Sequence, residues 1–394
     1  MGGWDCWQKG KRGMTVSVCF LGTICLSVMM AYLVFGDSTD EEGVRSLRMI
    51  AIIFRHGDRS PTEFYPNDPH RNHRAWTGGL GALSELGSQQ MYNLGKNLRP
   101  RYYRLLPPNG LYSKDHMYIV SSYAERCIMS AQSFMAGFMP PLENTNPLPI
   151  PWQPVAINTL QRDRDTILAQ KKPCPRYEQS LQRLMAYPPK DIRDLNERNA
   201  ALYKTLTLST GQNISTILDV ELLYNTLEIE KHAGLELPDW TETIFPEKML
   251  PLAERSLALF TETPLMKKIK GGAIVSELLD NMIRKRSGIL TPERSIFIYS
   301  AHDVTLVNLM RALGVVDQAT GKPDFSATLV AELHHSITFD DDFELKFVYY
   351  FNSEDKYPKE LRIPNCGDPC SLTRFGQLME SVHLKSYDEV CQLV

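Results

Sequence analysis

Two continuous apolar runs limit most strongly what this chain can fold into. Residues 49–54 and residues 295–300 are dominated by apolar side chains and lack the alternation of a strand with one face in water. Such runs are typical of strands that are buried on both faces, as in a parallel sheet between helices. We therefore expect an α/β fold with a mainly parallel central sheet flanked by helices.

Each of these runs ends in a polar cluster that contains a histidine. Arg55, His56 and Arg59 follow the first run, and His302 and Asp303 follow the second. Ligands of open α/β sheets bind beyond the carboxyl ends of the strands. Guanidinium groups match phosphate geometry, a neutral imidazole can attack phosphorus, and a carboxylic acid can protonate the leaving oxygen. A single histidine beside an arginine is usually part of a solvated loop, but two such clusters at strand ends predict a compact anion site.

The length and pattern of the chain predict how it is divided. A chain of 394 residues suits one large core with an insertion, or two domains. From residue 140 to about residue 264 the chain is first proline-rich and then amphipathic at helical spacing, with no buried strand run. We expect this segment to form a mainly helical cap inserted into an α/β domain that spans residues 47–394.

The N-terminal residues have the pattern of a targeting segment. Basic residues precede the uncharged stretch 14–36 and acidic residues follow it, which places the N-terminus on the cytoplasmic side. The stretch is long enough for a membrane helix, while its end also suits signal peptidase. A cleaved signal peptide and a retained single-pass anchor within residues 1–36 therefore both stay open. Either one delivers the body of the protein to the lumen or the outside, after a linker at 37–46, with membrane contact only through the N-terminal segment.

The remaining composition agrees with export and excludes one class of partner. A formal net charge of −3 provides no basic footprint for nucleic acid. Asn213 begins the Asn-Ile-Ser glycosylation sequon. Five cysteines outside the targeting segment allow up to two disulfides and one free thiol, and spacing alone leaves the pairing open. A zinc site at Cys366 and Cys370 is the rival interpretation, but a second ligand pair with suitable spacing is absent from the sequence.

The run from Arg55 to Pro61, Arg-His-Gly-Asp-Arg-Ser-Pro, resembles the phosphate-binding signature of the histidine acid phosphatases. This family includes the prostatic, lysosomal and insect venom enzymes. The Ser-Ala-His-Asp run at 300–303 resembles the second motif of the family, and the likeness extends from about Leu47 to Cys391. It implies a histidine phosphatase-like core and an acid phosphatase that hydrolyses phosphate monoesters of small molecules or proteins.

The resemblance also implies a role for each motif residue. His56 is the nucleophile that forms a phosphohistidine, and Asp303 is the general acid for the departing alcohol. Arg55 and Arg59 hold the phosphate oxygens, and His302 donates a hydrogen bond to the phosphoryl group. The family uses no metal or other cofactor, and because its members often dimerise, a homodimer is an allowed assembly.

The resemblance pairs the cysteines as well. It implies disulfides between Cys174 and Cys391 and between Cys366 and Cys370. Cys127 is then the odd thiol, and we expect it to be a small buried hydrophobe rather than a reactive group.

One departure from the family pattern raises an alternative function. The stretch 119–123 reads Ile-Val-Ser-Ser-Tyr where the family commonly reads Ile-Arg-Ser-Thr-Asp, so Val120 stands in place of the arginine that we interpret as the third phosphate ligand. Arg126 could in principle compensate for the lost ligand, but we expect it to have a structural role in the following helix. A weakened or inactive protein that binds phosphorylated ligands is therefore the alternative to an active phosphatase. A mutase is a third interpretation, and it requires a site that excludes water.

Overall fold

The computed structural model describes residues 46–72, 76–319, 321–339 and 342–393. The expected signal peptide or anchor at 1–36 and nearly all of the linker at 37–46 lie outside these residues. Within the described part of the chain, every helix is too short or too polar to span a membrane.

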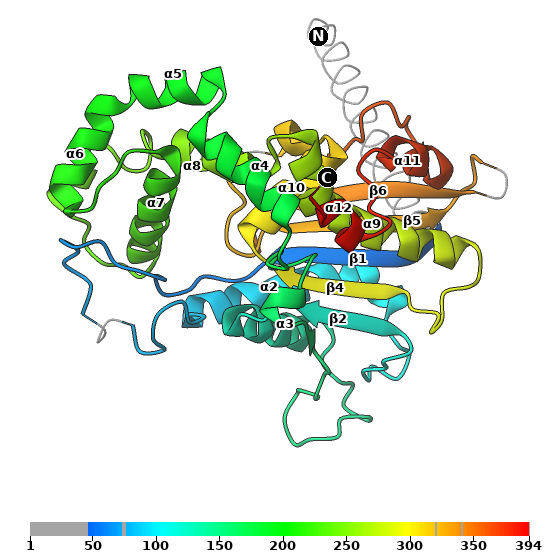
Figure 1. The fold of residues 1–394 in the computed structure, drawn as a ribbon. Helices are drawn as coiled ribbons and strands as arrows, with labels where there is room; N and C mark the ends of the chain where they lie inside the picture. The colour runs from blue at the N-terminus through cyan, green and yellow to red at the C-terminus, as the bar shows by residue number, and fades with distance from the viewer. Residues whose placement is uncertain (1–45, 73–75, 320, 340–341, 394) are drawn as a thin grey trace, which may run out of the picture. The chain divides into compact units, whose positions relative to one another are not determined.

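A mixed sheet forms the core of the fold, with strand order β3-β2-β4-β1-β5-β6-β7 and β8 paired to β6 (Figure 1). The pairs β1–β4, β4–β2 and β2–β3 are parallel, and β6 pairs antiparallel with β5, β7 and β8. The expected α/β class is thus confirmed, with parallel strands at the core of the sheet and antiparallel strands along one side. The strands are β1 (Leu47–Arg55), β2 (Met117–Ser121), β3 (Asn158–Thr159), β4 (Ile296–Ala301), β5 (Thr328–His335), β6 (Phe343–Tyr350), β7 (Lys359–Leu361) and β8 (Cys370–Ser371).

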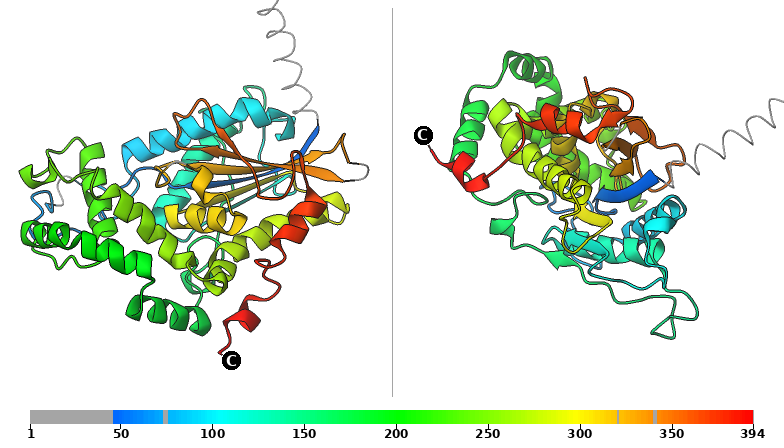
Figure 2. Two further views of the ribbon diagram at one scale, coloured as in Figure 1. Left: turned by 90° about the horizontal axis from the view of Figure 1, so that it is seen from above. Right: turned by 90° about the vertical axis from the view of Figure 1, so that its right-hand side faces the viewer.

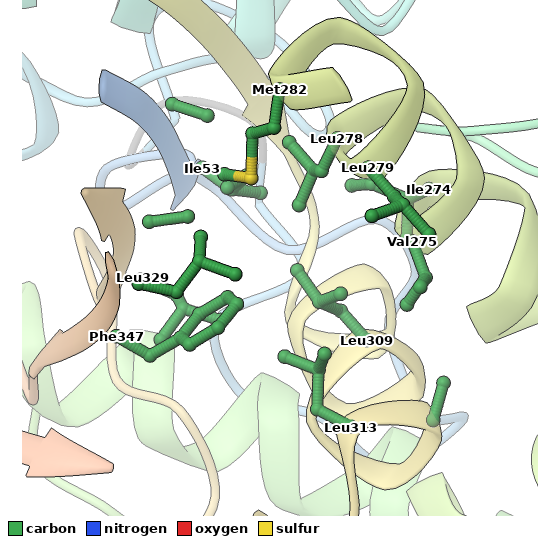
Figure 3. Packing of buried hydrophobic residues seen from close by; sticks show 14 of the residues in the cluster. Ile53, Ile274, Val275, Leu278, Leu279, Met282, Leu309, Leu313, Leu329 and Phe347 are labelled. Atoms are coloured by element: carbon green, nitrogen blue, oxygen red, sulfur yellow. The ribbon is translucent and has the colours of Figure 1, made fainter. Parts of the chain in front are cut away.

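Helices cover both faces of the sheet, with α2 and α3 on one face and α9 and α10 on the other (Figure 2). Phe54 of β1 packs against Phe134 of α3 with 5.0 Å between ring centroids. Its neighbour Ile53 belongs to the apolar cluster that also contains Leu278 of α9 and Leu309 of α10 (Figure 3). Side chains that alternate along a strand point to opposite faces, so the unbroken apolar run is explained by helices on both sides. These helices are α2 (Glu85–Tyr102), α3 (Glu125–Phe138), α9 (Pro264–Arg286) and α10 (Asp303–Leu313), and α11 (Leu372–Met379) and α12 (Tyr387–Cys391) follow near the C-terminus.

The segment from which we expect a helical cap contains five of the described helices. Figure 1 shows α4 to α8 gathered beyond the carboxyl ends of β1 and β4. They share a second apolar cluster, which includes Leu206, Leu227 and Leu252. These helices are α4 (Pro175–Ala186), α5 (Lys190–Arg198), α6 (Ala200–Thr210), α7 (Ile217–His232) and α8 (Leu250–Ala258). Short 3₁₀ turns are η2 (Tyr103–Leu105), η3 (Arg162–Arg164), η4 (Asp239–Thr241), η5 (Leu259–Thr261) and η6 (Val316–Gln318).

Both disulfides that the resemblance implies are present. Cys174 at the start of α4 is bonded to Cys391 at the end of α12, and Cys366 is bonded to Cys370. A disulfide between Cys366 and Cys370 leaves no thiolate there for zinc, so the zinc interpretation is excluded. Cys127 is a free, buried thiol on α3, as expected.

Candidate active site

The register of the sheet brings the two histidine clusters together. Strands β1 and β4 run parallel, with Arg55 opposite Ala301. The next residues, His56 and His302, therefore leave the sheet side by side, and their ring centroids lie 5.6 Å apart. The backbone N–H of His56 still donates to the carbonyl of Ala301 at 3.1 Å. The geometry places two imidazoles at one sheet edge from motifs nearly 250 residues apart in sequence.

The hydrogen bonds of His56 decide which ring nitrogen carries the proton. Nδ1 lies 2.8 Å from the carbonyl oxygen of Gly57, which can only accept, so Nδ1 holds the hydrogen. Nε2 is left with its lone pair. Burial, followed by the positive charge of Arg126, lowers the pKa of His56 well below its ordinary value. A neutral imidazole with a lone pair on Nε2 is the form that can act as a nucleophile.

Arg126 contacts this lone pair, contrary to the expectation that it has a structural role. Its Nε lies 3.0 Å from Nε2 of His56. Val120 instead is buried in the main apolar cluster beside Tyr299. The interpretation of Val120 as the residue that replaces the family's third phosphate ligand stays a prediction, and a third guanidinium reaches His56 from the first turn of α3. The position of Arg126 just after parallel strand β2 is the signal that could have revealed it.

Arg126 contacts the lone pair of His56, and Arg55 and Arg59 are near enough for their charges to lower the pKa of His56 as well. Arg55 donates to the carbonyl of Pro323 at 2.7 Å, and its guanidinium lies 4.0 Å from the ring centroid of Phe325. Arg59 donates to the carbonyl of Ser60 at 3.0 Å. The Nε atoms of Arg55 and Arg59 are buried without a hydrogen-bond partner among the residues that the structure describes. Buried donors without partners are costly, so the site is prepared for an anion with several acceptor oxygens.

The crowding of positive charge is visible in the pKa of Arg59. Burial, followed by repulsion from Arg126 and Arg55, lowers it to about 10. Among the described residues, the only carboxylate within ion-pair distance of these three arginines is Asp303, whose Oδ2 lies 3.1 Å from Arg55. One carboxylate does not neutralise three guanidinium groups. The remaining positive charge of the site therefore favours the binding of a further anion.

His302 is held neutral on the other side of the site. Its Nε2 lies 2.9 Å from the hydroxyl oxygen of Ser122. Burial, followed by the charge of Arg126, lowers the pKa of His302 to about 3. The Cys127 thiol is 3.9 Å from this ring, and burial raises the thiol pKa to about 12, which keeps it protonated and inert. Ser122 was not predicted from the sequence as a site residue.

Asp303 is ionised in the free site. Its Oδ1 accepts from the backbone N–H of Val304 at 2.7 Å, and its Oδ2 pairs with Arg55. Burial opposes ionisation, but the charges of Arg55 and then Lys322 outweigh it and hold the pKa well below the usual range. Lys322 itself forms a buried ion pair with Glu228 at 2.7 Å. The sequence pattern did not reveal Lys322 or Glu228, because both reach the site from segments outside the motifs.

The loop that carries His56 packs against the start of α2 with no room for a side chain. A Cβ on Gly57 would lie 2.3 Å from the carbonyl oxygen of Gly87, and a Cβ on Gly87 would lie 2.1 Å from that of Asp58. The side chain of Asp58 accepts from Ser84 at 2.6 Å, and its other oxygen lies 3.3 Å from Nδ1 of His232 on α7. These contacts fix the loop between the sheet core and the helical segment.

The described residues contain no group of three or more His, Cys, Asp or Glu side chains placed to hold a metal ion. The side chains gathered at the site are a buried neutral imidazole, three guanidinium groups, a second neutral histidine and one carboxyl group.

Comparisons with known proteins agree with this arrangement. Residues 46–352 match the histidine phosphatase superfamily, branch 2. The lysosomal acid phosphatase of Homo sapiens is 32% identical over 355 residues, which cover 89% of this chain and 81% of that protein. The venom acid phosphatase of Apis mellifera is 31% identical over 351 residues, which cover 88% and 87% of the two chains.

A solved structure shares the fold. The apo phytase of Hafnia alvei aligns with a TM-score of 0.65 at 17% identity, over 89% of this chain and 98% of that one. At this identity the likeness concerns the fold alone. The family match over most of the chain, together with relatives above 30% identity, shows that the protein belongs to the histidine acid phosphatase family.

Proposed function

We propose that this protein is an acid phosphatase that hydrolyses phosphate monoesters through a phosphohistidine on His56. The observation that carries the proposal is a neutral, buried imidazole whose lone pair is contacted by Arg126 and whose pKa is lowered by the nearby charges of Arg55 and Arg59. Phosphoryl transfer needs mainly positioning and stabilisation of negative charge, and this site supplies both. The relatives in the comparisons are acid phosphatases by name, which agrees with this activity.

In the first step, the phosphate ester binds among Arg55, Arg59 and Arg126. Its oxygens accept from the two buried Nε donors and attract the guanidinium of Arg126 away from Nε2 of His56. The freed lone pair attacks phosphorus and the P–O bond of the ester breaks. His302, which is neutral, donates a hydrogen bond to a phosphoryl oxygen.

Asp303 protonates the departing alcohol, although it is ionised in the free site. The bound phosphate competes with Asp303 for Arg55 and adds negative charge beside it. Both effects raise the pKa of Asp303 towards the range in which a carboxylic acid is protonated at acidic pH. Water then hydrolyses the phosphohistidine, with Asp303 as the base. Binding of the substrate thus raises the pKa of Asp303, so that Asp303 takes up from solvent the proton that it then donates.

The alternative of a weakened or inactive phospho-ligand-binding protein is the less favoured proposal. It rested on Val120 as a missing phosphate ligand, and Arg126 supplies a third guanidinium at the site. We also propose that the body of the protein is lumenal or extracellular, since two disulfides suit an oxidising compartment and the relatives include lysosomal and venom enzymes. Glycosylation at Asn213, which is exposed, and homodimer formation stay predictions.

The decisive experiment is turnover of a chromogenic phosphate monoester at acidic pH, with the His56→Ala variant beside the wild type. We expect release of phosphate by the wild type and none above background by the variant. Enzyme mixed at acidic pH with a ³²P-labelled ester and rapidly quenched in alkali should carry the protein-bound phosphoryl group, stable in alkali and labile in acid, that a phosphohistidine predicts. Equal rates for the two proteins contradict the proposal. Transfer of phosphate to a second hydroxyl compound, instead of its release, favours the mutase.

A further inference from the structure

A pocket with a volume of about 370 Å³ opens beside Asp303. Asp303 and Val304 at the start of α10 line one part of it, and residues of the loop 169–172 and of α4, α7 and α9 line the rest. This volume lies in the range of sites that enclose a small organic ligand. Because Asp303 is the proposed proton donor to the departing alcohol, the pocket lies where the leaving group of a bound ester would be.

Two lysines without counter-ions line this pocket. Neither Lys171 nor Lys270 forms an ion pair in the part of the chain that the structure describes, whereas the third lysine of the pocket, Lys172, pairs with Asp388 at 2.6 Å. Lys171 and Lys270 are close enough for their repulsion to contribute to the lowered pKa of Lys270. Two like charges that share a pocket without a partner are stabilised by an anion between or beside them.

Lys270 is held in place rather than free to rotate. Its Nζ donates to the carbonyl of Gln170 at 2.5 Å and lies 4.3 Å from the ring centroid of Tyr177. Burial, followed by Lys171, lowers its pKa to about 8, so the ammonium is charged throughout the acidic range. One hydrogen bond leaves two N–H donors of the ammonium for a ligand. A fixed cation loses less conformational entropy on binding than a mobile surface lysine.

The backbone that holds Lys270 is itself unusual. Gln170 has a φ of +55°, in the left-handed region that residues other than glycine rarely adopt. Its side chain donates to the carbonyl of Lys270 at 3.1 Å and accepts from Asn308 at 2.8 Å. Strained backbone of this kind persists where the surroundings hold it, and it clusters at functional sites. Here it fixes the lysine and the pocket wall together.

Asn308 presents an acceptor that has no partner. Its side chain lines the pocket, is 1% exposed, and has an Oδ1 that accepts no hydrogen bond from the described residues. A buried acceptor without a donor costs free energy unless a ligand supplies one. A hydroxyl group on the leaving group would do so.

Two glutamates also line the pocket and set its charge. Glu178 accepts from the backbone N–H of Cys174 at 3.3 Å. Burial, followed by the charge of Asp303, raises the pKa of Glu221 to about 7, so Glu221 is mostly neutral at acidic pH. With Asp303 paired to Arg55 and Lys172 paired to Asp388, the pocket keeps two lysines, Lys171 and Lys270, that form no ion pair among the described residues.

We propose that this pocket binds the leaving group of the ester, and that Lys270 with Lys171 selects leaving groups that carry a second anionic group, either a carboxylate or a further phosphate. This inference rests on the proposed phosphatase function and adds the class of substrate. Lys270 and Lys171 are specificity-determining residues in this proposal and take no part in the phosphoryl transfer itself.

Matched substrate pairs test the proposal at acidic pH and low ionic strength. Glycerol 3-phosphate and 3-phosphoglycerate differ only by a hydroxymethyl group and a carboxylate, and propane-1,3-diol monophosphate and bisphosphate differ by a second phosphate. We expect kcat/KM of the wild type to favour the anionic member of at least one pair by about 10-fold or more, the scale of a hydrogen bond to a charged group. A preference within the first pair identifies the carboxylate as the ligand, and one within the second pair identifies the phosphate.

Variants separate recognition from structure. Lys270→Met keeps an apolar stem over Tyr177 and should lower kcat/KM for the anionic member of a pair far more than for glycerol 3-phosphate, and Lys270→Arg should retain the preference. Lys171→Met, at an exposed position, should reduce the preference without a risk to folding. Lys268→Met is the control, because Lys268 lies on the same helix α9 but outside this pocket.

The outcomes that contradict the inference differ from those that contradict the phosphatase. Equal kcat/KM within both pairs for an active wild type, or an equal loss on neutral and anionic substrates in Lys270→Met, overturns the anion subsite and leaves the phosphatase intact. Failure of the wild type to release phosphate from every one of the four substrates and from the chromogenic ester overturns both.

Discussion

The Nε of Arg126 lies 3.0 Å from Nε2 of His56 and donates a hydrogen bond to the lone pair of the proposed nucleophile. In the free protein this contact satisfies a buried nitrogen and holds a third positive charge at the phosphate site. A phosphate group that attracts Arg126 also uncovers the lone pair. One guanidinium thus protects the nucleophile at rest and stabilises phosphate oxygens during transfer.

Arg126→Gln should lower kcat/KM by roughly 10- to 150-fold, since a hydrogen bond to a charged group contributes about 1.5–3 kcal/mol. The loss should occur without a comparable fall in melting temperature, because the removed charge repels Arg59. Steady-state kinetics with a chromogenic ester and a thermal melt measure the two quantities. A variant as active as the wild type would show that Arg126 does not contact the substrate.

Val120→Arg should not raise turnover. The side chain of Val120 is buried in the main apolar cluster, and Arg126 already supplies the third guanidinium. The comparison of kcat/KM for Val120→Arg and the wild type checks this. An increase of several-fold would restore the interpretation of Val120 as a missing phosphate ligand.

The pH dependence of the reaction should respond to Lys322. Its charge helps to lower the pKa of Asp303, so its removal raises that pKa and keeps the general acid protonated to higher pH. The double variant Lys322→Met, Glu228→Gln removes both charges of the buried pair and leaves neither partner unpaired. We expect the alkaline limb of its kcat/KM profile to move to higher pH.

The matched control for this double variant is Lys190→Met with Asp194→Asn, which removes the exposed ion pair on α5. That control should leave the pH profile unchanged. A shift to lower pH in the Lys322 double variant would contradict the assignment of Asp303 as the general acid.

Stability against pH should depend on Glu230, a fully buried carboxyl group that interacts with the carboxyl group of Asp68. Burial, followed by the charge of Asp68, raises its pKa to about 9. The folded state therefore holds a proton that the unfolded state releases above the ordinary glutamate pKa. This contribution to stability is fully present at low pH and is lost as the pH rises through about 9.

The melting temperature of the wild type should accordingly fall between pH 5 and pH 9, and Glu230→Gln should flatten that fall, because glutamine resembles the protonated acid at every pH. The exposed Glu242→Gln variant serves as the control and should keep the slope of the wild type. Parallel slopes for Glu230→Gln and the wild type would rule out this assignment.

Gly87→Ala should reduce kcat by about 100-fold, the scale on which a displacement of about 1 Å affects a catalytic group. Its new Cβ would lie 2.1 Å from the carbonyl oxygen of Asp58, two residues from His56, and the backbone must move. Gly376→Ala on α11 is the control, because its Cβ would meet only Leu279 at 3.9 Å. The control should keep full activity and gain up to about 1 kcal/mol of stability.

The sequence by itself determined the class of fold and half of the chemistry. Unbroken apolar runs require burial on both faces, and the histidine that follows each run must leave a parallel sheet at the same edge. For that reason the order of residues alone predicts that His56 and His302 lie close together. The two disulfides followed from a family resemblance, since spacing alone does not determine pairing.

The tertiary structure alone decided which further side chains reach the site and whether each of them is protonated there. Arg126 and Val120 both belong to the β2–α3 segment, and the residue pattern does not tell which of them faces His56, because that depends on where the helix starts. Lys322, Glu221 and the pocket lysines come from segments that become neighbours only when the chain packs. The pKa of a side chain depends on its burial and on the charges near it in space. The pKa values and the ion pairs of the site are therefore set by the fold and not by the order of residues.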